Sequence, residues 1–488
     1  MERLSRRELV GFSAASLLGE ESNAIAQAND QQAPIDLLVD FGRRLEPFRA
    51  LHGINKGAIG SGGLVSVEAE HRALGVPYVR LHDCHYPNPD VVDIHAVFPN
   101  PDADAVDPKS YDFALTDEYL ASVRATGAQI IYRLGESIEH TRHKRYVHPP
   151  KSPERWAQIA LGIIRHYNEG WANGFRYAIR YWEIWNEPEN RPVMWSGTDA
   201  DYFQLYKVTV LAIKAHSPNL KVGAPAVGNT GQIVAGKFVP SKFVEDFLAY
   251  CRKERLPLDF FSWHGYTADL LDLPLRARAI RKILDAAEFT HTESHLNEWN
   301  YLPDNSWEGL ARTTPAKVRQ AFVNRMTGME GGAFIVATLL ALQDAPVAVC
   351  NLFHGELGAF GLFNEQGVPF PNYHALLAFR ELLDTPNRVH TMGFRPQESV
   401  ISAGLAADNS FGQVLISNVF AKESVYRLTL KGLLWRTGTH YEIQIKDSAQ
   451  PEGKPKQQGT LKQKETLEIT LKAPAVALIK LRPAEQKE

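Results

Sequence analysis

The chain of 488 residues is poor in cysteine, with only Cys84, Cys251 and Cys350. Three scattered cysteines supply neither a disulfide framework nor the paired spacing of a zinc site. The net charge is only −3, which gives no reason to expect nucleic acid or an anionic membrane as a partner. No glycine-rich dinucleotide fingerprint follows the first expected strand, and no cofactor is expected.

The stretch LHDCH (81–85) places two histidines and an aspartate beside Cys84. In a strand, however, successive side chains point to opposite faces. These groups are therefore not expected to converge on one ion, and no metal site is predicted.

Residues 1–28 have the features of an export signal. Ser5-Arg6-Arg7 precedes an apolar run (9–19) that is too short to span a bilayer, and small residues follow at 24–28. The arginine pair is similar to a twin-arginine signal, which predicts a periplasmic or secreted protein. The alternative is an amphipathic first helix, which the early Glu20-Glu21 pair favours. No later segment is expected to cross a membrane.

Residues 46–387 alternate short β-branched or aromatic runs with longer amphipathic patterns. In the pattern at 152–170, apolar residues recur at helical spacing, with Ser152 as the expected N-cap and Pro153 at the first helical position. Eight β–α units in series predict an α/β fold, a (β/α)₈ TIM barrel, rather than an open doubly wound sheet. The eight expected strands lie within 51–55, 76–82, 128–134, 181–187, 220–226, 258–266, 294–299 and 347–353.

Residues 388–488 change to an alternating pattern of period two, broken by turn residues. This pattern predicts an accessory C-terminal antiparallel β-sandwich. A strand-like segment before the barrel, residues 33–45, is expected to join that sandwich. Residues 447–460 are polar and are expected to form a loop.

Two carboxylates stand at the ends of expected barrel strands. Glu187 follows Asn186 at the end of the fourth strand, and Glu298 follows another asparagine at the end of the seventh. Reactive groups of TIM barrels sit at the carboxyl ends of the strands, so both acids are expected to face one cavity. The other polar residues expected there are Asn55, Arg80, His82, His264 and Tyr266.

A pair of carboxyl groups suits the hydrolysis of a glycosidic bond. One acid protonates the departing oxygen, and the other attacks the anomeric carbon if the two stand about 5–5.5 Å apart. Arg80 is expected to hold the nucleophile ionised, and Trp185 with an apolar wall to hold the acid protonated. Asn186 is placed to bind the sugar 2-hydroxyl.

The remaining carboxylates near the strand ends are expected to have other roles. Glu183 is expected to be a buried partner of an arginine, and Glu189 to lie in the following loop. Glu136 is equally suited to binding sugar and to bracing a loop. Glu293 is out of phase with Glu298 and is expected outside the barrel. The basic loop 143–145 is expected to be solvated, but an acidic sugar bound there would change the substrate prediction.

These motifs carry a resemblance to a known family. WEIWNEPE (182–189) resembles the acid/base motif of the large retaining clan of (β/α)₈ glycoside hydrolases, and LNEWN (296–300) its nucleophile segment. The segment 353–379 resembles the end of the barrel in glycoside hydrolase family 39, which contains β-xylosidases and α-L-iduronidases. The resemblance implies that Glu187 is the general acid/base and Glu298 the nucleophile. The substrate-binding residues are then expected to be Asn55, Arg80, His82, Asn186, His264 and Tyr266. The tryptophan often present near the end of the eighth strand is absent from 347–353.

The expected function is that of a retaining, exo-acting glycoside hydrolase that removes terminal pentose or related sugars from oligo- or polysaccharides. The alternatives are an endo-acting polysaccharide hydrolase and a catalytically silent carbohydrate-binding barrel. The long loops 135–150 and 188–200 favour exo action. Sugar identity, anomer and oligomeric state stay open.

Overall fold

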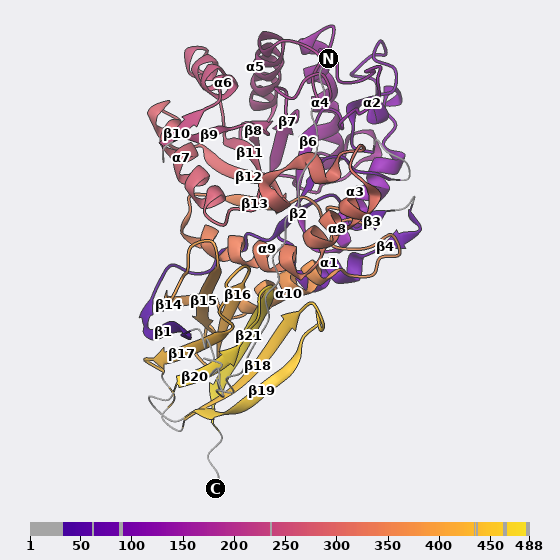
Figure 1. Ribbon diagram of the computed structural model, residues 1–488. Helices are drawn as coiled ribbons and strands as arrows, with labels where there is room; N and C mark the ends of the chain where they lie inside the picture. Colours follow the sequence, from indigo (N-terminus) through magenta and orange to yellow (C-terminus); the bar gives the residue numbers. More distant parts are fainter. Residues whose placement is uncertain are drawn as a thin grey trace, which may run out of the picture. The chain divides into compact units, whose positions relative to one another are not determined.

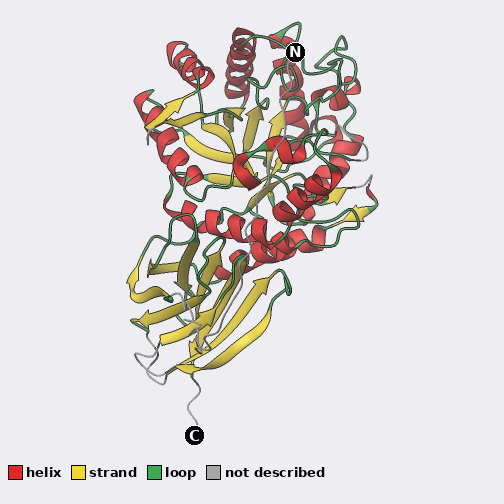
Figure 2. Ribbon diagram, in the orientation of Figure 1, coloured by secondary structure: helices red, strands yellow, loops and turns green. Residues whose placement is uncertain are grey.

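The computed structural model describes residues 33–60, 63–86, 91–234, 237–433, 435, 438–461 and 466–484. The expected export signal, residues 1–28, lies outside these ranges. Figure 1 shows the described chain coloured along its sequence, and Figure 2 separates its helices from its strands.

Eight parallel strands form a closed barrel, which confirms the predicted TIM barrel. The last barrel strand pairs with the first through Asn351 and Gly53, so no edge is left open. The barrel strands are β2 (Gly53–Asn55), β5 (Tyr78–Leu81), β6 (Gln129–Leu134), β7 (Tyr181–Ile184), β8 (Lys221–Val227), β11 (Phe260–Thr267), β12 (Glu293–Tyr301) and β13 (Val349–Leu352). Two hairpins accompany the barrel strands, β3 (Ile59–Gly60) with β4 (Val65–Ser66) and β9 (Gly231–Val234) with β10 (Lys237–Pro240).

Helices follow the barrel strands, and their starts obey the local sequence. The predicted cap of α4 is present, because the Ser152 hydroxyl accepts a hydrogen bond from the Arg155 amide and Pro153 opens the helix. The helices are α1 (Glu68–Leu74), α2 (Ile94–Val97), α3 (Ala114–Ala125), α4 (Pro153–Asn168), α5 (Asp199–His216), α6 (Lys242–Lys253), α7 (Asp272–Ala286), α8 (Ala316–Thr327), α9 (Met329–Ala341) and α10 (Pro371–Leu382). Short 3₁₀ helices are η2 (Pro108–Ser110), η3 (Trp171–Asn173), η4 (Pro303–Asn305), η5 (Trp307–Leu310) and η6 (Leu342–Asp344).

A second sheet of nine strands contains the C-terminal part of the chain. Its order is β19-β18-β21-β16-β15-β14-β1-β17-β20, and β1 runs antiparallel to β14 but parallel to β17. The N-terminal segment therefore lies inside this sheet, between two strands that come after the barrel. The strands are β1 (Ile35–Arg44), β14 (Asn387–Met392), β15 (Ser399–Leu405), β16 (Gly412–Asn418), β17 (Val425–Lys431), β18 (Thr439–Asp447), β19 (Lys454–Leu461), β20 (Thr466–Thr470) and β21 (Ala475–Pro483).

The sheet closes over a core of its own in the manner of a sandwich. Apolar side chains from β1, β15, β16, β17, β18, β20 and β21 form one buried cluster. A pocket bordered by Ile443 on β18 and Ile469 on β20 shows that strands far apart in the sheet order approach each other. The two layers of the predicted sandwich are thus parts of one continuous, mostly antiparallel sheet.

The prediction of a loop at 447–460 is wrong over its second half, which forms β19. This strand pairs only with β18 at the edge of the sheet, and almost all of its residues are exposed. A strand exposed on both faces needs no alternation of apolar and polar residues, so the pattern used for the other strands is missing here.

Helices α9 and α10 lie between the barrel and the second sheet (Figure 1). In α9, a Cβ atom on Gly332 would stand 2.8 Å from the Ala375 Cβ of α10, so the glycine permits the close approach of the two helices. The helical run Ala316–Asp344 has the length and hydropathy of a membrane span, contrary to the expectation that no later segment has them. Its most apolar window is 83% buried inside the protein, which is the burial of a helix packed within the core.

Candidate active site

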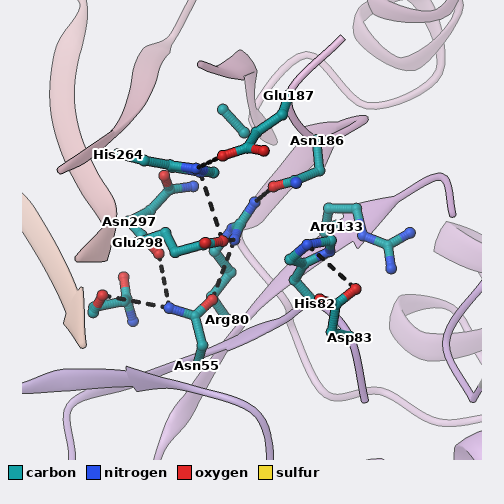
Figure 3. Close-up of polar contacts among 12 residues, drawn as sticks. Asn55, Arg80, His82, Asp83, Arg133, Asn186, Glu187, His264, Asn297 and Glu298 are labelled. Carbon is teal, nitrogen blue, oxygen red and sulfur yellow. Dashed lines mark hydrogen bonds and ion pairs between the residues drawn. The ribbon is translucent and has the colours of Figure 1, made fainter. Parts of the chain in front are cut away.

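A cavity of about 640 Å³ opens at the carboxyl ends of the barrel strands. Strands β7 and β12 bring Glu187 and Glu298 into its wall, and β11 brings Tyr266. This is the end of a TIM barrel at which reactive residues are found. Both predicted acids therefore face the same space (Figure 3).

Glu187 enters the cavity because the chain leaves strand geometry just before it. Strand β7 ends at Ile184, and Trp185 and Glu187 then adopt positive φ angles of 71° and 42°. In the site, one Glu187 oxygen is 2.8 Å from Nδ1 of His264, and the other accepts a hydrogen bond of 2.9 Å from the Asn190 amide. Both carboxylate oxygens are thus held in place.

Glu298 reaches the cavity through a bulge in β12. The register with β11 passes from Trp263 opposite Leu296 to His264 opposite Glu298, which leaves Asn297 as an extra residue. Two consecutive side chains can then face the barrel interior. Glu298 accepts hydrogen bonds from Tyr266 Oη at 2.7 Å and from Arg80 at 3.1 Å.

The two carboxylates and His264 lie close together. One oxygen of Glu187, one oxygen of Glu298 and a ring nitrogen of His264 are all within 4.8 Å of one another. His264 stands between the acids, with Nε2 3.8 Å from Glu298 (Figure 3). This close approach of the two oxygens is in keeping with the short spacing of a pair in which one carboxylate attacks the anomeric carbon directly.

Arg80 organises the floor of the site. Its guanidinium donates to Glu183 at 2.7 Å and to Asn186 at 2.6 Å, in addition to Glu298. It also donates to Asn55 at 3.1 Å, and all of these groups are buried. The predicted burial of Glu183 beside an arginine is confirmed by this contact.

The directions of the pKa shifts differ from the expected ones. Burial raises the pKa of Glu298 and outweighs the opposing effect of His264 and Arg80. Burial also acts on Glu187, but the hydrogen bond and the charge of His264 overcome it and lower the pKa of Glu187. The two acids in turn outweigh burial at His264 and raise its pKa. The shifts of the two acids are therefore opposite to the expected ones, and His264 is the cause at Glu187.

Trp185 does not protect the acid, contrary to the prediction. Its indole packs against Trp195 at 4.9 Å between ring centres and donates to the Met194 carbonyl. The positive φ of Trp185 interrupts the alternation of side chains that predicted its direction.

The other predicted site residues fall into two groups. His82, Asn186 and Tyr266 line the cavity, whereas His264 is buried between the acids. Asn55 and Arg80 were expected to contact substrate, but both side chains are fully buried and lie below the cavity lining. Their side chains are instead used in hydrogen bonds to each other and to other site residues, Arg80 to Glu298 and Asn186.

Among the other carboxylates, Glu189 lines the cavity from the loop after β7, and its Oε1 accepts from the amides of Gly228 and Asn229. Glu136 binds His95 Nδ1 at 2.5 Å. Glu293 was expected outside the barrel, but it binds Tyr181 Oη and His295 at the amino-terminal end of the barrel. The bulge at Asn297 reverses the phase from which that expectation was drawn.

Three aromatic residues of the cavity were not predicted as site residues. Trp307, Phe353 and Phe360 line it beside Tyr266, with the Trp307 and Tyr266 ring centres 4.9 Å apart. Phe353 ends the eighth expected strand, where the sequence lacks a tryptophan. Trp307 lies in η5, and only its position in a loop after a reactive strand could have indicated it.

Within the described ranges, two clusters have the spacing of metal ligands, Glu187 with His264 and Glu298, and Asp93 with His95 and Glu136. The LHDCH stretch contributes to neither. Asp93 is already paired with Arg133 at 2.5 Å, and Glu298 is paired with Arg80. In each cluster, therefore, a neighbouring arginine already balances one carboxylate.

Comparisons with known proteins identify the family of the chain. The model of glycosyl hydrolases family 39 matches residues 67–390. Beta-xylosidases from Geobacillus stearothermophilus and Caldicellulosiruptor saccharolyticus are 29% and 28% identical over 277 and 275 residues. These alignments cover 49% and 50% of this chain and 49% of each relative, so the match spans about half the length of the curated relatives.

A glucosidase from Croceicoccus marinus has the same fold, with a TM-score of 0.75 and 23% identity over 93% of this chain and 99% of that one. The matched family segment contains seven of the eight barrel strands in full, all except β2, and it includes Glu187 and Glu298. The chain belongs to glycosyl hydrolases family 39.

Proposed function

We propose that the protein is a retaining, exo-acting glycoside hydrolase that releases terminal xylose or a related pentose from oligo- or polysaccharides. The observation that carries the proposal is the approach of Glu187 and Glu298 oxygens to within 4.8 Å around one cavity. The similarity to two beta-xylosidases supports the choice of sugar.

In the first step, a carboxylate oxygen of Glu298 attacks the anomeric carbon while the bond to the leaving oxygen breaks. Glu187 donates a proton to that oxygen, so the aglycone departs as an alcohol and the sugar is held as an ester of Glu298. Tyr266 and Arg80 orient the attacking carboxylate through their hydrogen bonds. Their donors also favour its ionised form against the effect of burial.

In the second step, Glu187 accepts a proton from water, and the resulting hydroxide oxygen attacks the same carbon. The ester bond breaks, Glu298 is released as a carboxylate, and the sugar keeps its configuration. His264 stabilises the Glu187 carboxylate that remains between the two steps, because its Nδ1 is 2.8 Å from a Glu187 oxygen. Asn186, fixed by Arg80, is placed to bind the 2-hydroxyl.

Substitution of the two acids tests the assignment. Glu298→Ala is expected to abolish turnover, and added azide is expected to restore it with a glycosyl azide of inverted configuration as the product. Glu187→Ala is expected to retain far more activity on aryl glycosides with good leaving groups than on natural glycosides, because such groups leave without a proton. The matched control is Glu254→Ala. Glu254 directly follows helix α6 and pairs with Lys207, and this variant is expected to behave as the wild type.

A panel of nitrophenyl pentosides, hexosides and uronides tests the sugar, and the products from an end-labelled oligosaccharide test exo action. Normal hydrolysis of natural substrate by both acid variants would show that the assignment is wrong. Internal fragments as first products would favour an endo-acting enzyme. Binding without turnover across the panel would favour a catalytically silent carbohydrate-binding barrel.

We also propose that the protein is exported to the periplasm or secreted. The proposal is supported by the arginine pair and the apolar run within residues 1–28. Cell fractionation of the full chain and of an Arg6→Lys/Arg7→Lys variant tests it, and equal export of both would contradict a twin-arginine route.

A further inference from the structure

A second cavity of about 400 Å³ opens beside the catalytic one, and we call it the side pocket. It is bordered by α2 and the residues after it (94–102), by the loop and first turn of α4 (145–159), and by Glu136 and Trp185. Its volume lies in the range of cavities that bind small ligands. All of these residues lie within the described ranges.

The side pocket is a close neighbour of the catalytic cavity. Along the chain, Trp185 borders the side pocket, and the next two residues, Asn186 and Glu187, border the catalytic cavity. After β6, Glu136 likewise borders the side pocket, and Ile138 borders the catalytic cavity. The ends of β6 and β7 thus form the wall between the two cavities.

Three cations line the side pocket without a carboxylate partner. Arg145, Lys151 and Arg155 border it, and none of them forms a side-chain ion pair with any described residue. Nε of Arg155 is buried and has no hydrogen-bond partner, although the same guanidinium donates to the Ala103 carbonyl. A buried donor without a partner is unfavourable unless a ligand or water satisfies it.

The acidic groups of the side pocket do not balance these cations. Glu136 is engaged by the backbone and ring of His95, and burial raises its pKa to about 7. Asp102 remains as a carboxylate at the border. The pocket therefore has an excess of positive charge, which favours an anionic ligand.

The remaining lining is apolar and aromatic. Tyr146 is 43% exposed, and its ring stacks on His95 at 3.5 Å between ring centres with an interplanar angle of 5°. Phe98 and Trp156 border the same space. Flat aromatic faces stack on the C–H faces of sugar rings, while the cations are suited to a carboxylate on such a ring.

We propose that the side pocket binds an acidic saccharide unit, a sugar ring that carries a carboxylate. The proposal deepens the proposed function and rests on it, because the proposed function is the reason for taking the ligand to be part of a pentose-containing polysaccharide. Substrate chains that carry uronic acid would then be held at two neighbouring cavities, the terminal neutral sugar at the acids and the charged sugar beside Arg145 and Tyr146.

Calorimetric titration tests this with two matched ligands, a pentose oligosaccharide bearing one glucuronic acid and the methyl ester of the same compound. The protein is the full chain with Glu298→Ala, which prevents turnover. The acid is expected to bind about tenfold more tightly than the ester, because hydrogen bonds to charged groups contribute about that factor or more. High salt is expected to reduce the difference.

Substitutions locate the binding. Arg145→Ala/Lys151→Ala is expected to remove the preference for the acid, and Tyr146→Ala to weaken both ligands alike. Arg142→Ala, an exposed cation of the same loop that borders neither cavity, is the control and is expected to keep the preference. Equal affinity for acid and ester, or a preference that survives Arg145→Ala/Lys151→Ala, would overturn the proposal.

The outcome is separable from that of the proposed function. With Glu298 intact, Arg145→Ala/Lys151→Ala is expected to hydrolyse a neutral nitrophenyl pentoside at the wild-type rate. Absence of hydrolysis in the wild type would refute the glycosidase activity, whereas the binding titration would still decide whether the side pocket takes a carboxylate.

Discussion

Replacing Arg80 with methionine is expected to damage both stability and activity, for reasons that a second substitution can separate. Arg80 and Glu183 are fully buried and form an ion pair of 2.7 Å, and Asn297 also donates to Glu183. Arg80→Met leaves the Glu183 carboxylate buried without its cation. Breaking a buried pair in this way costs about 3–5 kcal/mol, a large part of the roughly 5–15 kcal/mol by which proteins are stable.

Arg80→Met/Glu183→Leu removes both charges and is expected to recover most of the lost stability, because an apolar pair replaces a buried ion pair at little cost. Activity is not expected to return, since Glu298 and Asn186 still lack their donor. Without Arg80 the pKa of Glu298 rises further, so the nucleophile is ionised only at higher pH. The acidic limb of the pH–rate profile should therefore move upward.

Urea unfolding followed by circular dichroism measures the stability of the three proteins, and kcat/KM on an activated aryl glycoside measures activity. Arg80→Met is expected to lose at least about a hundredfold in kcat/KM, by analogy with the loss of one preorganised donor. A wild-type unfolding midpoint for Arg80→Met would refute the energetic argument. Activity restored in the double variant would refute the role of Arg80 at Glu298.

Three further predictions follow from other parts of the structure. Burial raises the pKa of Glu189 to about 7, so the native state is destabilised as pH rises from about 4.5 to 7. The free energy of unfolding of Glu189→Gln should therefore exceed that of the wild type by on the order of 3 kcal/mol above pH 7 and equal it below pH 4, as measured by unfolding across pH. Trp307→Ala should raise KM about five- to tenfold with kcat nearly unchanged, because it removes an aromatic wall and no reacting group. Phe41→Ala, in the buried core of β1, should cost about 3–5 kcal/mol and lower the yield of soluble protein, whereas Arg43→Ala at an exposed position of the strand should not.

Much of the fold could be predicted from the sequence because it depends on local periodicity. The eight barrel strands were each marked by a short apolar run, and the α4 cap by Ser152 and Pro153. Strand β19 could not be found in this way, since an edge strand that is exposed on both faces has no apolar period. The apolar helix α9 was not distinguished as a core helix, because it is covered by α8, α10 and strands of the second sheet, which are distant contacts that no local pattern shows.

The sequence by itself determined which carboxylates meet, since the carboxyl ends of parallel barrel strands converge and Glu187 and Glu298 follow two of them. Only the tertiary structure decided how they meet. The bulge at Asn297 turns Glu298 inward, positive φ at Trp185 turns the indole away, and His264 from a third strand reverses the expected order of the pKa shifts. These outcomes depend on strand register and on contacts between residues far apart in the chain, and no local pattern specifies either.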